Sequence, residues 1–323
     1  MASGWSGVRV LGVRVAWAAG AALALSAVVA CSSTGTASGN GDGDGGDDRP
    51  IVLATTSIWG DVVGRVVCDG SAEVGVLIPA GADPHDYEPS LADRARLDAA
   101  ALIVLNGLGL EGSLAEVAGE AGDAVFTMSD HVGTLAPPDT EHVDPHAAGD
   151  PHVWLDPANV VGAIPALAQA LIDEAGLDAA TITACADDYG RELRELDAEI
   201  GSLLAEVPPE RRQLVTNHDA LGYFARRYDF TIVGSIIPSS SSLAQASPAQ
   251  LEKLARAVRD ADVPAIFTES GHAADDAEAL AREAGGIPVV ALFTDSLGDE
   301  GSEASTYAGM LRHDARLIAE ALR

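Results

Sequence analysis

The stretch AATITACADDYGRELRELDAEIGSLLAE, residues 179–206, decides the fold that we expect for this chain of 323 residues. Its only glycines are Gly190 and Gly201, and it predicts one unusually long helix. A shorter helix is predicted before it, with Asp156 as N-cap and Pro157 in the first position. The rest of the sequence falls into two series of elements, one on each side of this helical pair.

Apolar runs of strand length alternate with amphipathic segments in both series. The runs are IVLATT (51–56), EVGVLI (73–78), ALIVLN (101–106) and AVFTM (124–128) in the first series, and QLVT (213–216), FTIVGSI (230–236), AIFTE (265–269) and PVVALF (288–293) in the second. Alternating strands and helices predict parallel sheets covered by helices. We therefore expect an α/β fold with two βα lobes, each with a parallel four-stranded sheet, joined by one long rigid helix.

The N-terminus has the pattern of a secretory signal. Arg9 and Arg14 precede an apolar stretch, 15–30, that is too short for a comfortable membrane span. The sequence Val-Val-Ala-Cys that ends at Cys31 resembles a bacterial lipobox, in which the cysteine becomes the lipid-modified first residue of the mature chain. The alternative is an ordinary signal peptide with an incidental cysteine. The polar residues that follow, 32–48, favour the lipoprotein because they predict a flexible tether between an anchor and a domain.

These observations divide the chain into five parts. We expect a signal peptide (1–30), a lipidated cysteine with its tether (31–49), an N-terminal lobe (50–175), a linking helix (176–207) and a C-terminal lobe (208–323). At 47% hydrophobic residues the chain can fill two cores.

The chain is strongly acidic, with 49 Asp and Glu against 19 Lys and Arg, and a net charge of −30. A polyanionic partner would be repelled, so nucleic acid is excluded. Acidity would suit a protein that attracts cations, although acidic surfaces mostly serve solubility.

Three histidines and one aspartate follow predicted strands. His85 lies after the second strand of the first lobe, His152 ends the loop after its fourth strand, and His218 comes two residues after the first strand of the second lobe. Asp295 follows the last strand of that lobe. Ligands of open parallel sheets bind beyond the carboxyl ends of the strands. We therefore expect these four side chains to meet in the cleft between the lobes.

The four segments carry a family resemblance. PHDYEPS around His85, DPHVWLDP around His152, VTNHDALGYFARRYDF around His218 and ALFTDSLG around Asp295 are similar to the metal-site segments of the ZnuA/TroA-like solute-binding lipoproteins. These lipoproteins deliver zinc or manganese to ABC importers. The resemblance extends from about residue 50 to the C-terminus. It implies that these four residues are the metal ligands and that an ABC permease with its ATPase is the partner.

The ligand set favours zinc. Three imidazoles and one carboxylate suit four-coordinate Zn²⁺, whereas manganese or calcium sites carry more oxygen. The family that this chain resembles has manganese-type members, in which the third ligand is typically glutamate. Here the third position is His218. A manganese or iron carrier of the same family is the alternative.

Other residues near the predicted site have more than one interpretation. Glu269 ends a strand of the second lobe and is the rival of Asp295, as a ligand or as a partner of a ligand. Tyr87 and Glu88 would support the His85 loop or be solvated, and Ser90 is interpreted as a helix cap.

Two other histidines and two cysteines each have two interpretations. His142 and His146 lie in the short acidic segment before His152, and we interpret that segment as a polar loop rather than a metal-capturing one. Cys68 and Cys185 would either form a disulfide, which would fasten the linking helix to the first lobe, or remain as buried thiols.

Two other classes of function are alternatives to metal transport. A zinc hydrolase would keep an open water position and a general base, and an adhesin would bind its ligand without metal. Neither has a sequence feature of its own. The sequence therefore predicts a monomeric, extracytoplasmic, lipid-anchored zinc-binding protein of an ABC importer, and no enzyme.

Overall fold

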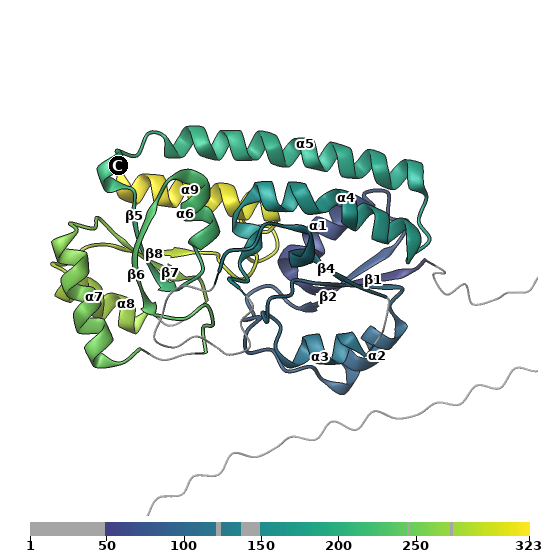
Figure 1. Ribbon diagram of the computed structural model, residues 1–323, viewed down its shortest axis with the longest axis horizontal. Coiled ribbons are helices and arrows are strands. Elements are labelled where there is room, and N and C mark those ends of the chain that lie inside the picture. Colours follow the sequence, from purple (N-terminus) through teal and green to yellow (C-terminus); the bar gives the residue numbers. More distant parts are fainter. Residues whose placement is uncertain (1–48, 121–123, 137–148, 244–245, 272–273) are drawn as a thin grey trace, which may run out of the picture. The chain divides into compact units, whose positions relative to one another are not determined.

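The computed structural model describes residues 49–120, 124–136, 149–243, 246–271 and 274–323. The predicted signal peptide, the lipidation site Cys31 and most of the tether lie outside these residues, and so do His142 and His146. The described part is an α/β structure with parallel sheets (Figure 1). The predicted fold class is confirmed.

The N-terminal lobe contains one four-stranded parallel sheet in the order β2-β1-β3-β4. Its elements are β1 (Ile51–Thr56), α1 (Ser57–Val67), β2 (Glu73–Ile78), α2 (Leu91–Ala99), β3 (Leu102–Leu105), α3 (Ser113–Gly119), β4 (Val125–Thr127) and the 3-10 helix η2 (Met128–His131). The central strands are buried because helices cover both faces of the sheet. Val52 faces the cluster that contains α1, and Leu53 faces the cluster that contains α2 and α3, as the alternation of side chains along a strand requires.

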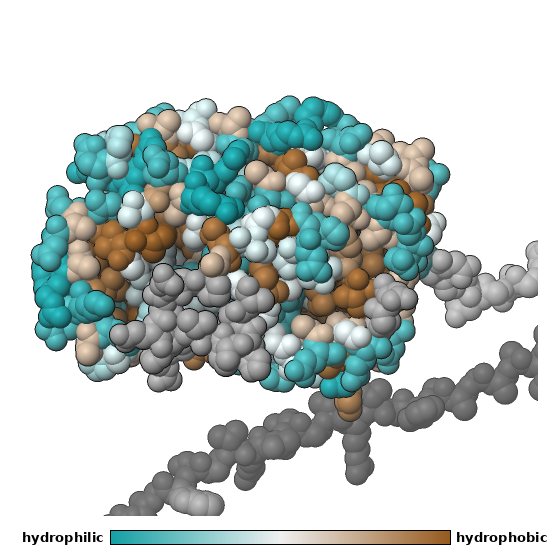
Figure 2. All heavy atoms as spheres, viewed as in Figure 1, coloured by the Kyte–Doolittle hydropathy of each residue, from teal (hydrophilic) through white to brown (hydrophobic). Residues whose placement is uncertain are grey.

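A pair of packed helices follows the first sheet. After the 3-10 helix η3 (Val153–Leu155), α4 (Pro157–Asp173) begins with Asp156 as N-cap, whose carboxylate accepts the amide of Ala158. The long helix α5 (Ala179–Leu204) begins at Asp178, which caps Thr181 in the same way. Both helices run close to their predicted bounds. Figure 2 shows hydrophilic residues over much of α5, whose buried stripe, including Leu193 and Leu196, faces inward.

The C-terminal lobe differs from the prediction in its hydrogen bonding. Its elements are η4 (Pro209–Arg211), β5 (Gln213–His218), α6 (Gly222–Tyr228), β6 (Thr231–Ile237), α7 (Pro248–Asp260), β7 (Ile266–Glu269), α8 (Asp275–Glu283), β8 (Val289–Leu292) and α9 (Tyr307–Leu322). The strands form two parallel pairs, β5-β6 and β7-β8, rather than one four-stranded sheet. β5 lies beside β7 without joining their ladders, and β5-β6 carries a register shift between Leu214 and Val215.

The sequence predicted two separate cores, but the structure has one large core that both lobes share. The largest cluster of buried side chains runs from β1 and α1 through α4 and α5 to α6 and α9, so it belongs to both lobes. Each lobe adds a smaller cluster on the outer face of its strands. The long helix is therefore part of a shared core and not a spacer between two cores.

Cys68 and Cys185 form a disulfide in the structure, with 6.1 Å between their Cα atoms. Cys68 caps the C-terminus of α1, and Cys185 lies in the second turn of α5. The bridge attaches the long helix to the N-terminal lobe, as the disulfide interpretation of these two cysteines predicted. Across the described residues, no helix is both long and apolar enough to cross a membrane.

Candidate metal centre

His85 is presented by a tight turn at the carboxyl end of β2. The amide of Ala82 donates to the carbonyl of Pro79 at 3.1 Å, and Gly81 has φ +80°. A turn with a positive φ at its third residue favours glycine there. After the turn, the carboxylate of Asp83 accepts the amide of His85 at 2.8 Å and so holds the start of the ligand's backbone.

His152 lies between the Asp150 turn and η3 and is completely buried. Asp150 Oδ1 accepts its amide at 3.0 Å and lies 2.8 Å from its ring Nδ1. A proton on Nδ1 that is donated to this carboxylate leaves Nε2 as the electron-pair donor of the ring. This Nε2 atom lies 3.4 Å from the carboxylate of Asp295.

The C-terminal lobe supplies the other two side chains. His218 is the last residue of β5, not two residues beyond it as expected, because the strand is longer than the apolar run QLVT. Asp295 lies in the loop after β8. The indole Nε1 of Trp154, close to His152, donates to the carbonyl of Thr294 at 2.7 Å, which holds the Asp295 loop against the N-terminal lobe.

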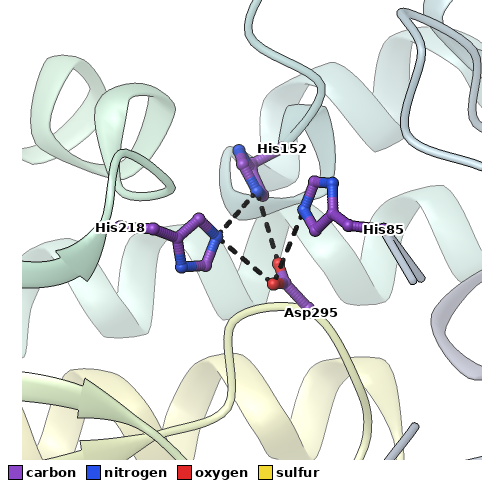
Figure 3. A group of neighbouring side chains, drawn as sticks. All are labelled: His85, His152, His218 and Asp295. Carbon is purple, nitrogen blue, oxygen red and sulfur yellow. Dashed lines mark hydrogen bonds and ion pairs between the residues drawn. The ribbon is translucent and has the colours of Figure 1, made fainter. Parts of the chain in front are cut away.

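These four side chains meet at one point (Figure 3). Each offers one ligand atom, and these atoms all lie within 4.8 Å of one another. The carboxylate of Asp295 lies 3.2 Å from Nε2 of His218, 3.4 Å from Nε2 of His152 and 3.8 Å from Nε2 of His85. The four residues that the sequence placed in the cleft are thus brought together.

Burial of these polar atoms is energetically unfavourable unless a cation compensates for it. The Asp295 side chain is 3% exposed, and neither of its oxygens has a hydrogen-bond partner within the described residues. His85 Nε2 is likewise buried without a partner there. A buried carboxylate that accepts no hydrogen bond is strongly unfavourable unless an ion pair or a metal compensates for it. The site therefore has the character of a cation site.

Burial and neighbouring charges shift the pKa values of His85, His152 and Asp295. Burial, only partly offset by Asp295, lowers the pKa of His85 to about 4. For His152, burial acts in the same direction, but the carboxylates of Asp150 and Asp295 outweigh it and raise the pKa to about 10. Burial would raise the pKa of Asp295, but His218 and His152 hold it well below its usual range.

Glu269, the predicted rival of Asp295, lies at the end of β7 behind it. Its Oε1 accepts the amides of Thr294 at 3.1 Å and Asp295 at 3.4 Å. It is not part of the group of four that could hold an ion. Burial and the neighbouring Asp295 carboxylate raise its pKa well above the usual value. The geometry favours a supporting role over a ligand role.

Tyr87, Glu88 and Ser90, which follow His85 in the chain, form hydrogen bonds at the starts of α2 and α3. The Tyr87 hydroxyl donates to Asp93 at 3.0 Å, and Glu88 accepts the hydroxyl of Ser113 at 3.1 Å. Ser90 caps α2 in a reciprocal capping box with Asp93. These residues shape the start of α2 rather than the ring position.

The sequence interpretation missed the aspartates that support the candidate ligands. Asp83-Pro84-His85 and Asp150-Pro151-His152 form the same turn, in which the aspartate accepts the histidine amide. The recurrence of Asp-Pro-His before two candidate ligands was the signal that could have revealed it. A third support was also missed: the Asn106 amide Nδ2 donates to the carbonyl of Pro151 at 2.9 Å.

Known proteins share this fold. Residues 52–321 match the family described as ZnuA, zinc-uptake complex component A, periplasmic. The zinc-binding protein TroA of Treponema pallidum is 32% identical over 281 residues, which cover 85% of this chain and 90% of that protein. Its solved structure has a TM-score of 0.75 at 31% identity and covers 85% of this chain and 99% of that one.

Relatives with other metals in their names are similar as well. The manganese-binding lipoprotein MntA of Halalkalibacterium halodurans is 29% identical over 272 residues, covering 84% of this chain and 88% of that protein. The Mn-bound periplasmic metal-binding protein of Candidatus Liberibacter asiaticus has a TM-score of 0.75 at 25% identity, covering 85% and 100% of the two chains. The match to the family covers more than half of the sequence and includes all four residues of the site. This chain therefore belongs to the ZnuA family.

Proposed function

We propose that this protein captures Zn²⁺ outside the cytoplasm and delivers it to the permease of an ABC importer. Members of the family are metal-binding solute-binding proteins of such importers and not enzymes, and this holds for the present chain. The identity of the metal, the ligands and the anchor are the parts that we propose.

The donor set is the observation that carries the choice of zinc. We assign His85, His152, His218 and Asp295 as ligands. Bonds of roughly 2.0–2.1 Å in a tetrahedral zinc site place the ligand atoms about 3.3–3.4 Å apart. The Nε2–carboxylate separations of 3.2, 3.4 and 3.8 Å are close to that spacing. Three nitrogens and one carboxylate also suit zinc better than an oxygen-preferring ion.

Manganese is the second candidate, and iron the third. The relatives MntA and PsaA have manganese in their names, and YfeA of Yersinia pestis is an iron-binding protein. Asp295 can bind through one or both oxygens, which would provide the extra oxygen ligand that a harder ion prefers. A direct comparison of the ions is therefore required.

The way the protein is held outside the cytoplasm is also part of the proposal. Several relatives have the word lipoprotein in their names, and the sequence Val-Val-Ala-Cys ending at Cys31 fits lipidation of that cysteine. We propose a monomer attached to the membrane by the lipid, with the polar residues after Cys31 as its tether.

Calorimetric titration of metal-free protein with Zn²⁺ and with Mn²⁺ tests the proposal. We expect one ion per chain and tighter binding of zinc by at least about tenfold, because imidazole ligands favour zinc. His85→Ala should abolish tight binding. The control is His131→Ala, because His131 is exposed and, among the described residues, stacks on Phe126 with ring centroids 4.6 Å apart. Manganese that binds as tightly as zinc would contradict the zinc assignment, and unchanged binding by His85→Ala would contradict the site.

A further inference from the structure

The loop that carries His85 is bound to the opposite lobe at two points. The amide of Gly81 donates to the hydroxyl of Ser296 at 2.6 Å, directly after the ligand Asp295. The hydroxyl of Ser242, in the loop after β6, donates to Oδ2 of Asp83. Both partners come from the C-terminal lobe, although the loop belongs to the N-terminal lobe.

The two Asp-Pro-His turns use their aspartates differently. Asp150 accepts the amide and faces the ring Nδ1 of its own histidine, so both contacts stay within the turn. Asp83 accepts the amide of His85 with Oδ1, and its other oxygen accepts Ser242 across the cleft. The first turn therefore connects its ligand to the other lobe, whereas the aspartate hydrogen bonds of the second turn, within the described ranges, stay in the turn itself.

His85 is the ligand candidate that lies farthest from the Asp295 carboxylate, with 3.8 Å between its Nε2 and Asp295 Oδ2. Its ring is buried, with 4% of the side chain exposed, but its loop reaches the surface, because Gly81 and Asp86 on either side of it are exposed. Movement of this loop would carry His85 away from the other three side chains, and here that requires the loop to separate from the C-terminal lobe.

We propose that Asp83 is a positioning residue for His85 and that its hydrogen bond with Ser242 retains the ion. This bond is called here the Asp83–Ser242 latch. The inference rests on the proposed function, since it assigns His85 as a ligand. With the latch formed, His85 stays within reach of the other ligands. When the latch opens, the loop can carry the imidazole away, and the ion dissociates.

The kinetics of release test the latch. Metal-free protein is first titrated with Zn²⁺ and with Mn²⁺, and the ion that binds more tightly is used. Its dissociation is then followed by stopped flow with an excess of chelator. Ser242→Ala should raise the dissociation rate constant by about tenfold or more, in the range seen for residues that orient metal ligands. The association rate constant and the zinc-to-manganese preference should not change, because the ligand set is intact.

Three further variants separate the latch from general damage. Ser242→Thr keeps a hydroxyl and should restore slow release, and Asp83→Ala, which removes both acceptor oxygens, should release the ion quickly. The control is Ser241→Ala, because the Ser241 hydroxyl accepts the amide of Leu243 within its own segment. All variants should keep the melting temperature of the metal-free wild type. Unchanged release from Ser242→Ala would overturn the latch and leave the proposed function intact. A preference for manganese in the first titration would contradict the assignment of zinc and leave the latch intact.

Discussion

The Nε2 atoms of His152 and His218 lie 3.2 Å apart, although 66 positions separate the two residues in the chain. His152 is held by Asp150 and by the Asn106 contact to Pro151, and His218 is held by the β5-β6 ladder. Two nitrogens from different lobes are thus directed at one point by contacts of the protein itself. Part of the entropic cost of assembling the site has therefore been met by folding.

The identity of the third ligand should control metal preference. His218→Glu would replace one nitrogen by a carboxylate, and we expect zinc to lose more affinity than manganese, since imidazole suits zinc and carboxylate suits manganese. Calorimetric titration of the metal-free variant and wild type with both ions measures the change. The same titration of His313→Glu is the control, because His313 lies away from the site, beside Glu303 and Phe293. Equal losses for the two ions in His218→Glu would show that this ligand does not set the preference.

Glu269 should matter through the backbone of the Asp295 loop. Glu269→Ala removes the acceptor of the Thr294 and Asp295 amides, and we expect about a 10- to 100-fold loss of zinc affinity. Glu269→Gln keeps an oxygen acceptor and should bind nearly as well as wild type. A Gln variant as weak as the Ala variant would indicate that the carboxylate itself binds the ion.

The disulfide should stabilise the fold without changing the site. It joins residues separated by 117 positions, and its loss should lower the free energy of unfolding by about 2–4 kcal/mol. Urea unfolding of the Cys68→Ser/Cys185→Ser double variant measures this loss against oxidised wild type. Zinc affinity should remain unchanged, because neither cysteine contacts a ligand in the structure. Equal stability of variant and wild type would mean that the bridge is not formed in the purified protein.

Asp314 should make stability depend on pH. Within the part of the chain that the structure describes, this buried carboxylate of α9 accepts the amide of Phe293 at 3.2 Å, and burial raises the pKa of its carboxyl well above the usual value. Below the ordinary pKa of about 3.9 both folded and unfolded chains are protonated. Above it, the unfolded chain releases the proton first, so the free energy of unfolding falls until the pH reaches the raised folded value.

The Asp314→Asn variant tests this pH dependence. It keeps an oxygen acceptor for Phe293 and removes the titration, so its stability should fall less than that of wild type as the pH rises above about 4. Urea unfolding of metal-free protein at several pH values gives the comparison, with Asp260→Asn as an exposed control on α7. Parallel curves for wild type and Asp314→Asn would contradict the assignment.

The predicted anchor can be tested by fractionation of cells. Cys31→Ala should move the protein from the detergent-extracted membrane fraction to the soluble secreted fraction, since a lipid rather than a helix would hold it. Ser32→Ala is a neighbouring control that should stay in the membrane fraction. A Cys31→Ala protein that remains with the membrane would contradict lipidation at this residue.

The sequence predicted the fold well where the pattern is local. The run IVLATT, the Asp156 cap and the long segment from Ala179 each specify an element through a few adjacent residues, and the structure has β1, α4 and α5 there. The pairing of the C-terminal strands was predicted incorrectly, because the register between β5 and β7 depends on contacts far apart in the sequence. The shared core was missed for the same reason.

The candidate ligands could be predicted because a general rule links strand ends to ligand sites. His85, His152, His218 and Asp295 each follow a strand or end one, so their type and place in the chain were enough. Ser242 and Ser296 could not be found in this way. Their importance depends on a hydrogen bond across the cleft, and a serine in a serine-rich loop has no local pattern that distinguishes it.

The core that both lobes share bears on how such a protein can be rebuilt. One half of a protein can usually be exchanged for that of a relative when each half folds alone. Here a cut near α5 would expose apolar surface on both fragments, because residues of α1, α5 and α9 pack in one cluster. New metal preferences should therefore arise by replacement of the short loops that carry the ligands, and chimaeras that exchange whole lobes should be insoluble more often than loop grafts.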